Sequence, residues 1–507
     1  MAQLQYSIDL RETFFSLLSE QQGRTIIGKT VGESPTIEDK PRLAYCHNVM
    51  PSAYGMDSIG YLSIIPAVVL PFGVSFSDVR IAYGSAKSRI HLAWDNLGRV
   101  YVLIPGSTSW VLLSATSPVT TSTDFSNDSV TIATVNGVSY IFYSGIGAFT
   151  YNETTTKLDA VTLTGLTISA ILGLVAASGY LVAYTSEAIA WSSTIDPTDF
   201  VPSQVTGAGG GNVAGIAGAI LFITPNPLGF LVHTIANTIA ATFTGNVQFP
   251  FKFRPIKNGK GGISLDLIAY EAESSEQFLY SKAGLQTVDS QRADTVLPEV
   301  TDFLAGRRFE DFNETTKLYE TTDLVASETM KKKIKLIASR YLVISYGLPT
   351  SSDFTHALIY DLSLKKLGKI KTPHVDVFEY IGDQTEVAKE TIAFVLSTGE
   401  VKALDFSATA TGSGVVILGK LQATRTRMID LLGVEVENVE TGDTLSVDSQ
   451  ASLDGKTFTL ASGSLLSSAE GLRTYGFRSS AKNHSLMFIG RFNLVAALVT
   501  YKSTGRR

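Results

Sequence analysis

From about residue 76 onward, the chain consists of short runs in which β-branched and aromatic residues alternate with polar ones. Runs of period two, bounded by Gly, Asn, Asp and Ser, are typical of β-strands. The clearest pair is 131–135 and 138–143, which Asn136-Gly137 joins. This dipeptide readily adopts the two positive-φ positions of a tight hairpin turn. The pattern therefore predicts a mainly β protein.

Similar strands recur along the chain and begin near residues 99, 138, 180, 219, 278, 341 and 391. The first intervals are about 40 residues, the length of a four-stranded propeller blade, and the later ones are longer. The segments 151–158 and 360–367 also repeat one arrangement: a strand end, a polar turn, a Lys and an apolar strand start. We expect this arrangement to join the two outer strands of a blade. From this spacing we predict a β-propeller-like body of six or seven blades.

Three regions are expected. Residues 1–75 form a helical or extended docking segment, because Leu10, Phe14, Leu17 and Leu18 recur at helical spacing. This segment either covers the core or contacts a neighbouring subunit. Residues 76–412 form the propeller-like body, and residues 413–507 form a C-terminal β region that is either a small sandwich or a final blade.

Charged residues are concentrated around 252–340, which we interpret as an insertion in the body. Mixed charge runs of this kind usually mark solvated loops and helix faces. The alternative is a rim that contacts partners. Arg307, Arg308 and 331–333 are the candidates for phosphate contacts, but acidic residues surround them, so we favour the solvated interpretation.

Charged residues make up only 17% of the chain, and the net charge is −6. A net negative charge argues against simple electrostatic binding of nucleic acid, which needs a basic surface. Two tracts, 160–186 and 200–251, contain no charged residue. Glycines and prolines interrupt both, so we expect buried or assembly-facing strands and no stable membrane partner.

The most distinctive local feature is a loop in which two aspartates are the only charged residues and are expected to form turns. A strand ending at Trp191 leads to Asp196-Pro197, Asp199 and Phe200, and then to Gly209-Gly210-Gly211. Proline restricts its own φ and the residue before it, while Asp side chains cap turns. Trp191 and Phe200 offer apolar surface that pins the loop to a core. We expect a rigid structural loop that returns to another strand.

This loop resembles a signature of tail-nozzle proteins, also called packaged-DNA stabilisation proteins, of short-tailed bacteriophages. Further segments resemble the same family: Cys46 to Gly55, Gly229-Phe230 followed by Asn237, and Tyr360 to Gly368. The matched segments lie in this order between about residues 40 and 410.

The resemblance implies a propeller-based virion structural protein that is not an enzyme. It implies a homohexameric ring below the portal and adaptor proteins, with tail fibre or tail needle proteins beside or below it. The ring would retain packaged double-stranded DNA and form its ejection channel without sequence-specific binding. The protein would be assembled in the host cytoplasm and located in the virion tail. Head-to-tail contacts close into such a ring when the rotation fits, and we expect the tract 200–251 to be buried between subunits or along the closed channel.

No catalytic, cofactor-binding or metal site is predicted. Cys46 is the single cysteine, which excludes an internal disulfide, and the six histidines lack zinc spacing. The segment 23–30 matches the P-loop pattern, but no suitable strand precedes it and no helix can follow it, so we interpret the match as accidental. The alternative function is a carbohydrate-binding or carbohydrate-degrading propeller component of a phage tail. That function would need carboxylates and aromatic residues at one mouth of the propeller; a third alternative is a peptide-binding scaffold.

Overall fold

The computed structural model covers the 507-residue chain. It describes residues 4–9, 14–15, 25–26, 42–53, 55–64, 76–95, 97–104, 107, 109–113, 130–213, 215–270, 275–304, 309–313, 318–322, 331–347, 351–380, 391–397, 400–405, 414–418, 421–422, 427–438, 444–453, 459–469 and 471–506.

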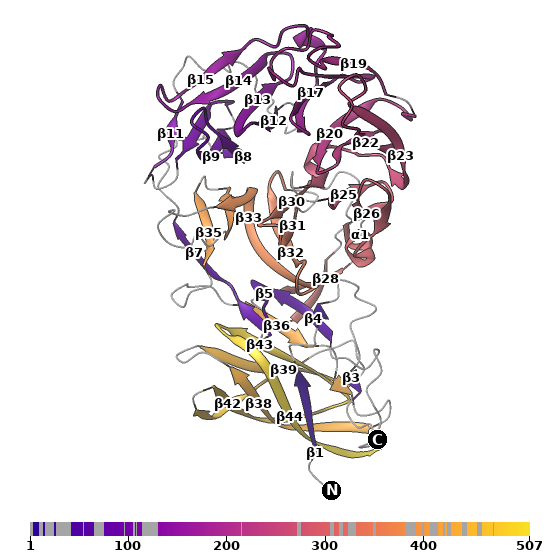
Figure 1. The fold of residues 1–507 in the computed structure, drawn as a ribbon. Helices are drawn as coiled ribbons and strands as arrows, with labels where there is room; N and C mark the ends of the chain where they lie inside the picture. Colours follow the sequence, from indigo (N-terminus) through magenta and orange to yellow (C-terminus); the bar gives the residue numbers. More distant parts are fainter. Residues whose placement is uncertain are drawn as a thin grey trace.

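Five consecutive four-stranded antiparallel sheets form most of the upper body in Figure 1, and we call them blades one to five. They are β8 (Phe76–Tyr83), β9 (Arg89–Asp95), β10 (Val100–Leu103) and β11 (Val111–Leu112); β12 (Val130–Val135), β13 (Val138–Tyr143), β14 (Gly147–Asn152) and β15 (Lys157–Val161); β16 (Gly173–Ala177), β17 (Tyr180–Tyr184), β18 (Ala188–Trp191) and β19 (Gly209–Asn212); β20 (Ile220–Asn226), β21 (Gly229–Thr234), β22 (Asn237–Phe243) and β23 (Phe251–Lys260); β24 (Ile268–Ala269), β25 (Gln277–Ser281), β26 (Gly284–Val288) and β27 (Ala293–Thr295).

Blades six and seven share one long strand. Blade six contains β30 (Lys332–Ile337), β31 (Tyr341–Tyr346), β32 (Phe354–Asp361) and the first part of β33 (Lys366–Tyr380). The second part of β33 pairs with β34 (Thr391–Leu396), which pairs with β35 (Val401–Asp405). The outermost strand of blade seven is β7 (Gly60–Ile64), which comes from the N-terminal part of the chain. This pairing closes the ring, because it joins segments from the two ends of the propeller sequence.

Apolar side chains fill the spaces between neighbouring blades. Trp94 and Tyr143 belong to a cluster shared by blades one and two, and Phe142 to one shared by blades two and three. Further clusters join blades three, four and five, blades five and six, and blades six and seven. Phe378 and Val79 belong to the cluster between blades seven and one. The described strands therefore form a closed β-propeller of seven blades, and the expected all-β, propeller-like fold is confirmed.

Both ends of the chain combine in a second body, the sandwich at the bottom of Figure 1. One of its sheets contains β1 (Leu4–Asp9), β44 (Asn493–Arg506), β38 (Arg427–Asn438), β42 (Leu472–Ala481) and β41 (Ser464–Ala469). The other contains β2 (Phe14–Phe15), β3 (Thr25–Ile26), β4 (Arg42–His47), β36 (Gly414–Leu418), β37 (Leu421–Gln422), β39 (Leu445–Ser452), β40 (Thr459–Ser462) and β43 (Asn483–Gly490). One apolar cluster contains residues of both sheets, such as Val434 and Phe488.

Two short strands connect the sandwich to the propeller. β5 (Val49–Pro51) pairs with β33 at the outer edge of blade six, and β6 (Met56–Ser58) pairs with β5 and β44. One continuous sheet therefore runs from blade six into the sandwich. We expect the two bodies to move little relative to each other.

The described parts of the N-terminal segment are extended, which is one of the two conformations expected for it. Leu4–Asp9 and Phe14–Phe15 are strands that complete the sandwich together with residues after 413. Of the four apolar residues at helical spacing, only Phe14 lies among the described residues, in a strand that pairs with β4. The P-loop match at Gly28 and Lys29 lies outside the described residues.

Residues 252–340 differ from the expected insertion. They contain most of β23, the whole of blade five, and β30, the first strand of blade six. The segment also holds α1 (Pro298–Leu304) and the hairpin of β28 (Phe309–Asn313) and β29 (Leu318–Thr322). Arg307 and Arg308 lie outside the described residues. Within the parts of the chain that the structure describes, no helix has the length and apolar character needed to cross a membrane.

Two local predictions from turn chemistry are confirmed. Asn136 and Gly137 have φ values of 54° and 79° and connect β12 to β13. The repeated segments form the turns between the third and fourth strands of blades two and six. Thr156 and Lys365, at equivalent positions of these turns, have φ values of 54° and 55°.

Candidate functional site: the charged centre of the propeller

A cavity of about 650 Å³ lies at the centre of the propeller. Its lining comes from the first strands of blades one, two, five, six and seven, which are β8, β12, β24, β30 and the end of β33. The mouth of a propeller is a frequent place for ligand sites, so the side chains around this cavity are the first candidates for chemistry.

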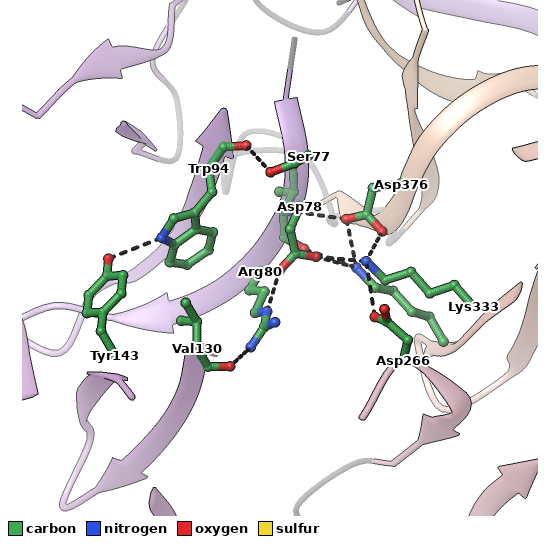
Figure 2. Close-up of polar contacts among 11 residues, drawn as sticks. Ser77, Asp78, Arg80, Trp94, Val130, Tyr143, Asp266, Lys333 and Asp376 are labelled. Atoms are coloured by element: carbon green, nitrogen blue, oxygen red, sulfur yellow. Dashed lines mark hydrogen bonds and ion pairs between the residues drawn. The ribbon is translucent and has the colours of Figure 1, made fainter. Parts of the chain in front are cut away.

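Lys333 lies at the centre of a buried ionic network (Figure 2). Its Nζ is 2.7 Å from Asp376 Oδ1 and 2.9 Å from Asp78 Oδ1. Asp266, in the short 3₁₀ turn Leu265–Leu267, approaches the same nitrogen at 3.8 Å. These three carboxylates come from blades seven and one and from the connection into blade five, so a single ammonium group links three parts of the ring.

A second lysine on the same strand strengthens the link. Lys335 Nζ is 2.8 Å from Asp376 Oδ2 and 3.5 Å from Asp78 Oδ1. The backbone N–H of Val79 also donates to Asp376 Oδ2 at 2.8 Å. The first strands of blades six, seven and one are therefore held together by charge-assisted hydrogen bonds, which are stronger than neutral ones.

Arg80 extends the network to blade two (Figure 2). Its Nε is 2.5 Å from Asp78 Oδ2, and its Nη1 donates to the carbonyl oxygen of Val130 at 2.6 Å. Nearby, Trp94 Nε1 donates to Tyr143 Oη at 3.1 Å, which is another polar link between blades one and two.

A separate ion pair lies at the cavity wall. Arg89 Nη2 is 3.0 Å from Glu379 Oε1, and the His91 ring is hydrogen-bonded to the carbonyl oxygen of Glu379 at 3.0 Å. Burial lowers the pKa of His91 to about 4, so this ring is neutral at pH 7.

Alternation in the sequence explains how these charges reach the centre. Lys333 and Lys335 point to one side of β30, while Ile334 is buried in the core between the blades. Period-two alternation places successive side chains on opposite faces of a strand. Asp78 and Asp376 likewise occur next to apolar residues in β8 and β33.

The electrostatics of the network keep it ionised. Burial alone would raise the pKa of Asp78, but Arg80, Lys333 and Lys335 outweigh it and hold that pKa well below its usual range. Burial would lower the pKa of Lys333, but Asp376 and Asp78 outweigh it and raise that pKa above its ordinary value. Asp78 and Lys333 are therefore fixed charges at neutral pH, whereas burial lowers the pKa of Lys335 below its ordinary value.

This arrangement suits structural support better than acid–base chemistry. A glycosidase needs one carboxyl group whose pKa is raised, so that it can donate a proton. Asp78 shows the opposite shift, and each carboxylate named above has a cationic partner. Within the described ranges, no group of three or more His, Cys, Asp or Glu side chains is placed to hold a metal ion.

The signature loop lies elsewhere, between β18 and β19 of blade three. Trp191 Nε1 donates to the carbonyl oxygen of Gly207 at 2.9 Å. Asp196 Oδ1 accepts hydrogen bonds from the backbone N–H and the hydroxyl group of Thr198, which lower the pKa of Asp196. Asp199 Oδ1 accepts from the N–H of Val201 at 3.0 Å. Both carboxylates therefore cap turns.

The rest of the signature anchors this loop. Pro197 lies inside the turn that Asp196 caps, and Phe200 is buried in the cluster between blades two and three. Gly209, Gly210 and Gly211 pair with Trp191, Ala190 and Ile189 in the outermost strand of blade three. A Cβ atom on Gly210 would lie 2.7 Å from the carbonyl oxygen of Ile189, whereas one on Gly211 would meet nothing within 4 Å.

The structure does not bring the signature residues into the central cavity. Asp78, Lys333 and Lys335 line the cavity; of these, only Lys333 was named from the sequence, as a candidate for phosphate contacts. The expectation of a solvated lysine run is wrong for Lys333, which is 4% exposed. In residues 332–337, lysines alternate with Ile and Leu, and this pattern could have indicated a strand with one charged face.

Comparisons with known proteins add little. No family model matches the chain, and no curated protein matches it. Solved structures that are similar include the WD40 β-propeller domain of Doa1, with 12% identity, 69% of this chain and 98% of that chain covered, and a TM-score of 0.39. YCF48 bound to D1 peptide has 10% identity, 70% and 100% coverage, and a TM-score of 0.36. The β-propeller domain of Myceliophteria thermophila Cps50 (Swd1) has 10% identity, 65% and 96% coverage, and a TM-score of 0.38.

Proposed function

We propose that the chain is a structural subunit of the tail nozzle of a short-tailed bacteriophage. In this proposal six copies form a ring below the portal and adaptor proteins, retain the packaged DNA and form its ejection channel. The subunit has no enzymatic role. The family resemblance of the segments around Trp191, Cys46, Gly229 and Tyr360 motivates the proposal.

The observation that carries the proposal is an exposed apolar surface on blades three and four, which we call the apolar loop surface. Val205, Ile195 and Phe249 are 88%, 78% and 71% exposed. They lie in the loops 192–208 and 244–250, which join the third and fourth strands of these blades. The remaining members of the surface are Val201, Leu228, Phe243 and Val247.

These residues lie close together. A Cβ atom on Gly207, in the first loop, would be 2.8 Å from a side-chain carbon of Val247, in the second. The ring centroids of Tyr180 and Phe243 are 6.1 Å apart, and the N–H of Phe243 donates to the carbonyl oxygen of Leu228. The two loops and the turn of Leu228 therefore form one surface.

An exposed apolar surface of this kind usually marks a protein–protein contact. The tract 200–251 contains no charged residue, so the only charged residues in the two loops are Asp196 and Asp199. A head-to-tail contact through such a surface closes into a ring when the rotation fits. The apolar loop surface is our candidate for the contact between neighbouring subunits.

The test is native mass spectrometry of the purified protein, alone and with its adaptor. We expect a ring with the wild-type chain and loss of that ring with Val205→Asp/Phe249→Asp. The matched control is Leu97→Asp, which changes an exposed apolar residue in a turn of blade one. A wild-type chain that stays monomeric with the adaptor would refute the proposal, as would a double variant that still forms the ring.

The carbohydrate-active alternative draws on one observation, the central cavity, which Asp78, Asp266 and Glu379 line together with Tyr83 and Tyr270. These acids and aromatic residues are of the kind that sugar sites use. A reducing-sugar assay on host glycans tests it, with Asp266→Asn as the inactive variant. Release of sugar by the wild type but not by the variant would favour this function over the nozzle.

A further inference from the structure

Blade four has an unusual charge distribution. Residues 200–265, which include the whole blade, contain no Asp or Glu, whereas each of the other six blades contains at least one. Its charged residues are Lys252, Arg254, Lys257 and Lys260. A chain of net charge −6 therefore places four cations on one blade without any acid.

All four cations belong to a single strand, which we call the basic strand. It is β23, the outermost strand of blade four, at the outer rim of the propeller in Figure 1. The four side chains are exposed, and among the described residues none of them forms an ion pair. The ten residues of β23 pair end to end with the seven residues of β22, so at about 3.3 Å per residue of β22 the strand spans about 20 Å, which corresponds to about six base pairs of duplex DNA.

Protection of a sheet edge explains only part of this pattern. Lysines, a proline and a bulge on an edge strand hinder pairing with other chains. β23 has Pro255 and a register shift near Asn258, whose φ is 60°. Protection, however, does not require charges of one sign. The outermost strand of blade two carries Lys157 together with Asp159.

We infer that the basic strand binds the phosphates of duplex DNA without reading its sequence. The inference rests on the proposed function, in which packaged DNA passes the ring. β23 begins directly after the loop 244–250 of the apolar loop surface, so a contact between subunits there leaves the basic strand beside it. Exposed Lys and Arg side chains bind phosphates electrostatically, and the binding weakens with salt. Such contacts retain DNA and still release it.

The net charge argued against nucleic-acid binding, but a net charge averages over the whole surface. The binding of a polyanion depends on the local distribution of charge on the surface that it contacts. A row of cations is complementary to a row of phosphates, whereas an acidic protein partner would need carboxylates at the same spacing. The duplex is therefore the occupant that we propose, and an acidic polypeptide is tested as its competitor.

The experiment is fluorescence anisotropy with a labelled duplex of about 30 base pairs and the purified full chain. If four phosphates are neutralised, the slope of log K against log salt is about −3.6. The affinity then falls on the order of 100-fold between about 50 and 200 mM salt. Replacing all four cations of the basic strand by Gln should abolish the salt-dependent binding, and Lys252→Gln/Arg254→Gln should reduce the slope by about two.

The control is Lys157→Gln/Lys282→Gln, which removes two exposed lysines on other blades and should leave the slope unchanged. Circular dichroism and thermal unfolding check that each variant is folded. Equal binding by the fourfold variant and the wild type would overturn the inference. Competition by polyglutamate as effective as that by unlabelled DNA would also overturn it, in favour of an acidic partner.

Native mass spectrometry of the same proteins separates this result from the proposed function. A fourfold variant that forms the ring but does not bind DNA supports both. If the wild-type chain forms the ring and the substituted variants bind DNA as tightly as it does, only the inference about the basic strand is overturned. If DNA binding depends on the basic strand but the chain forms no ring with the adaptor, only the proposed nozzle function is overturned.

Discussion

Replacing Lys333 by Met tests whether the charged network holds the propeller closed. Met has a similar length and no charge, so the substitution removes the central cation and leaves Asp376 with Lys335 and Asp78 with Lys335 and Arg80. At distances of 2.7 and 2.9 Å, each pair has a gross Coulomb attraction of about 6 kcal/mol at an effective dielectric constant of about 20. Most of this attraction offsets the desolvation of the charges. Removing one partner of a buried pair costs about 3–5 kcal/mol net, and because Lys335 and Arg80 remain beside the carboxylates, we expect a loss at the lower end of this range.

Differential scanning calorimetry measures the effect. For a propeller of roughly 330 residues (76–405), a loss of about 3–5 kcal/mol lowers Tm by about 4–7 °C. The control Lys282→Met changes an exposed lysine between β25 and β26 and should shift Tm by less than about 1 °C.

A double variant separates charge from packing. Adding Asp376→Asn to Lys333→Met leaves one carboxylate, Asp78, for the remaining cations Lys335 and Arg80, so part of the lost stability should return. A Tm for Lys333→Met within about 1 °C of the wild type would refute the reasoning. So would a double variant less stable than the single one, because the cost would then come from packing rather than from buried charge.

Three further predictions concern single positions. Gly210→Ala should lower Tm by a few degrees, because its Cβ would meet the carbonyl oxygen of Ile189, whereas Gly211→Ala should leave Tm nearly unchanged; equal Tm values in calorimetry would contradict this. Burial raises the pKa of Cys46 to about 12, so this thiol should not react with a disulfide reagent at pH 8 unless the chain is unfolded, and rapid labelling of the folded protein would contradict its burial. Burial lowers the pKa of His233 to about 3 and of His374 to about 4. Because both values are below the unfolded pKa of about 6.5, stability is greatest above pH 6.5 and falls by about 3–5 kcal/mol per ring as the pH drops through the folded values of about 3 and 4. Between pH 7 and pH 5 the expected loss is about 2 kcal/mol per ring, which urea unfolding measures, and pH-independent stability would contradict the lowered pKa values.

The strands and several of their turns were predictable from the sequence. Period-two alternation, the Asn136-Gly137 hairpin and the repeat around Lys157 and Lys366 depend on residues that are close in the chain. Local backbone preference and side-chain alternation decide such features. The same holds for the signature loop, whose carboxylates cap amides only two residues away.

The charged centre, the N-terminal strands of the sandwich and the closing strand were decided only by the tertiary structure. Asp78 and Lys333 are 255 residues apart, and nothing in the sequence near either one indicates the other. A charged residue in an apolar strand is compatible with an exposed face or with a buried partner, and desolvation selects between the two only after the ring has closed. For the same reason, nothing within residues 4–9 indicates the pairing of this strand, because its partners lie near residue 500.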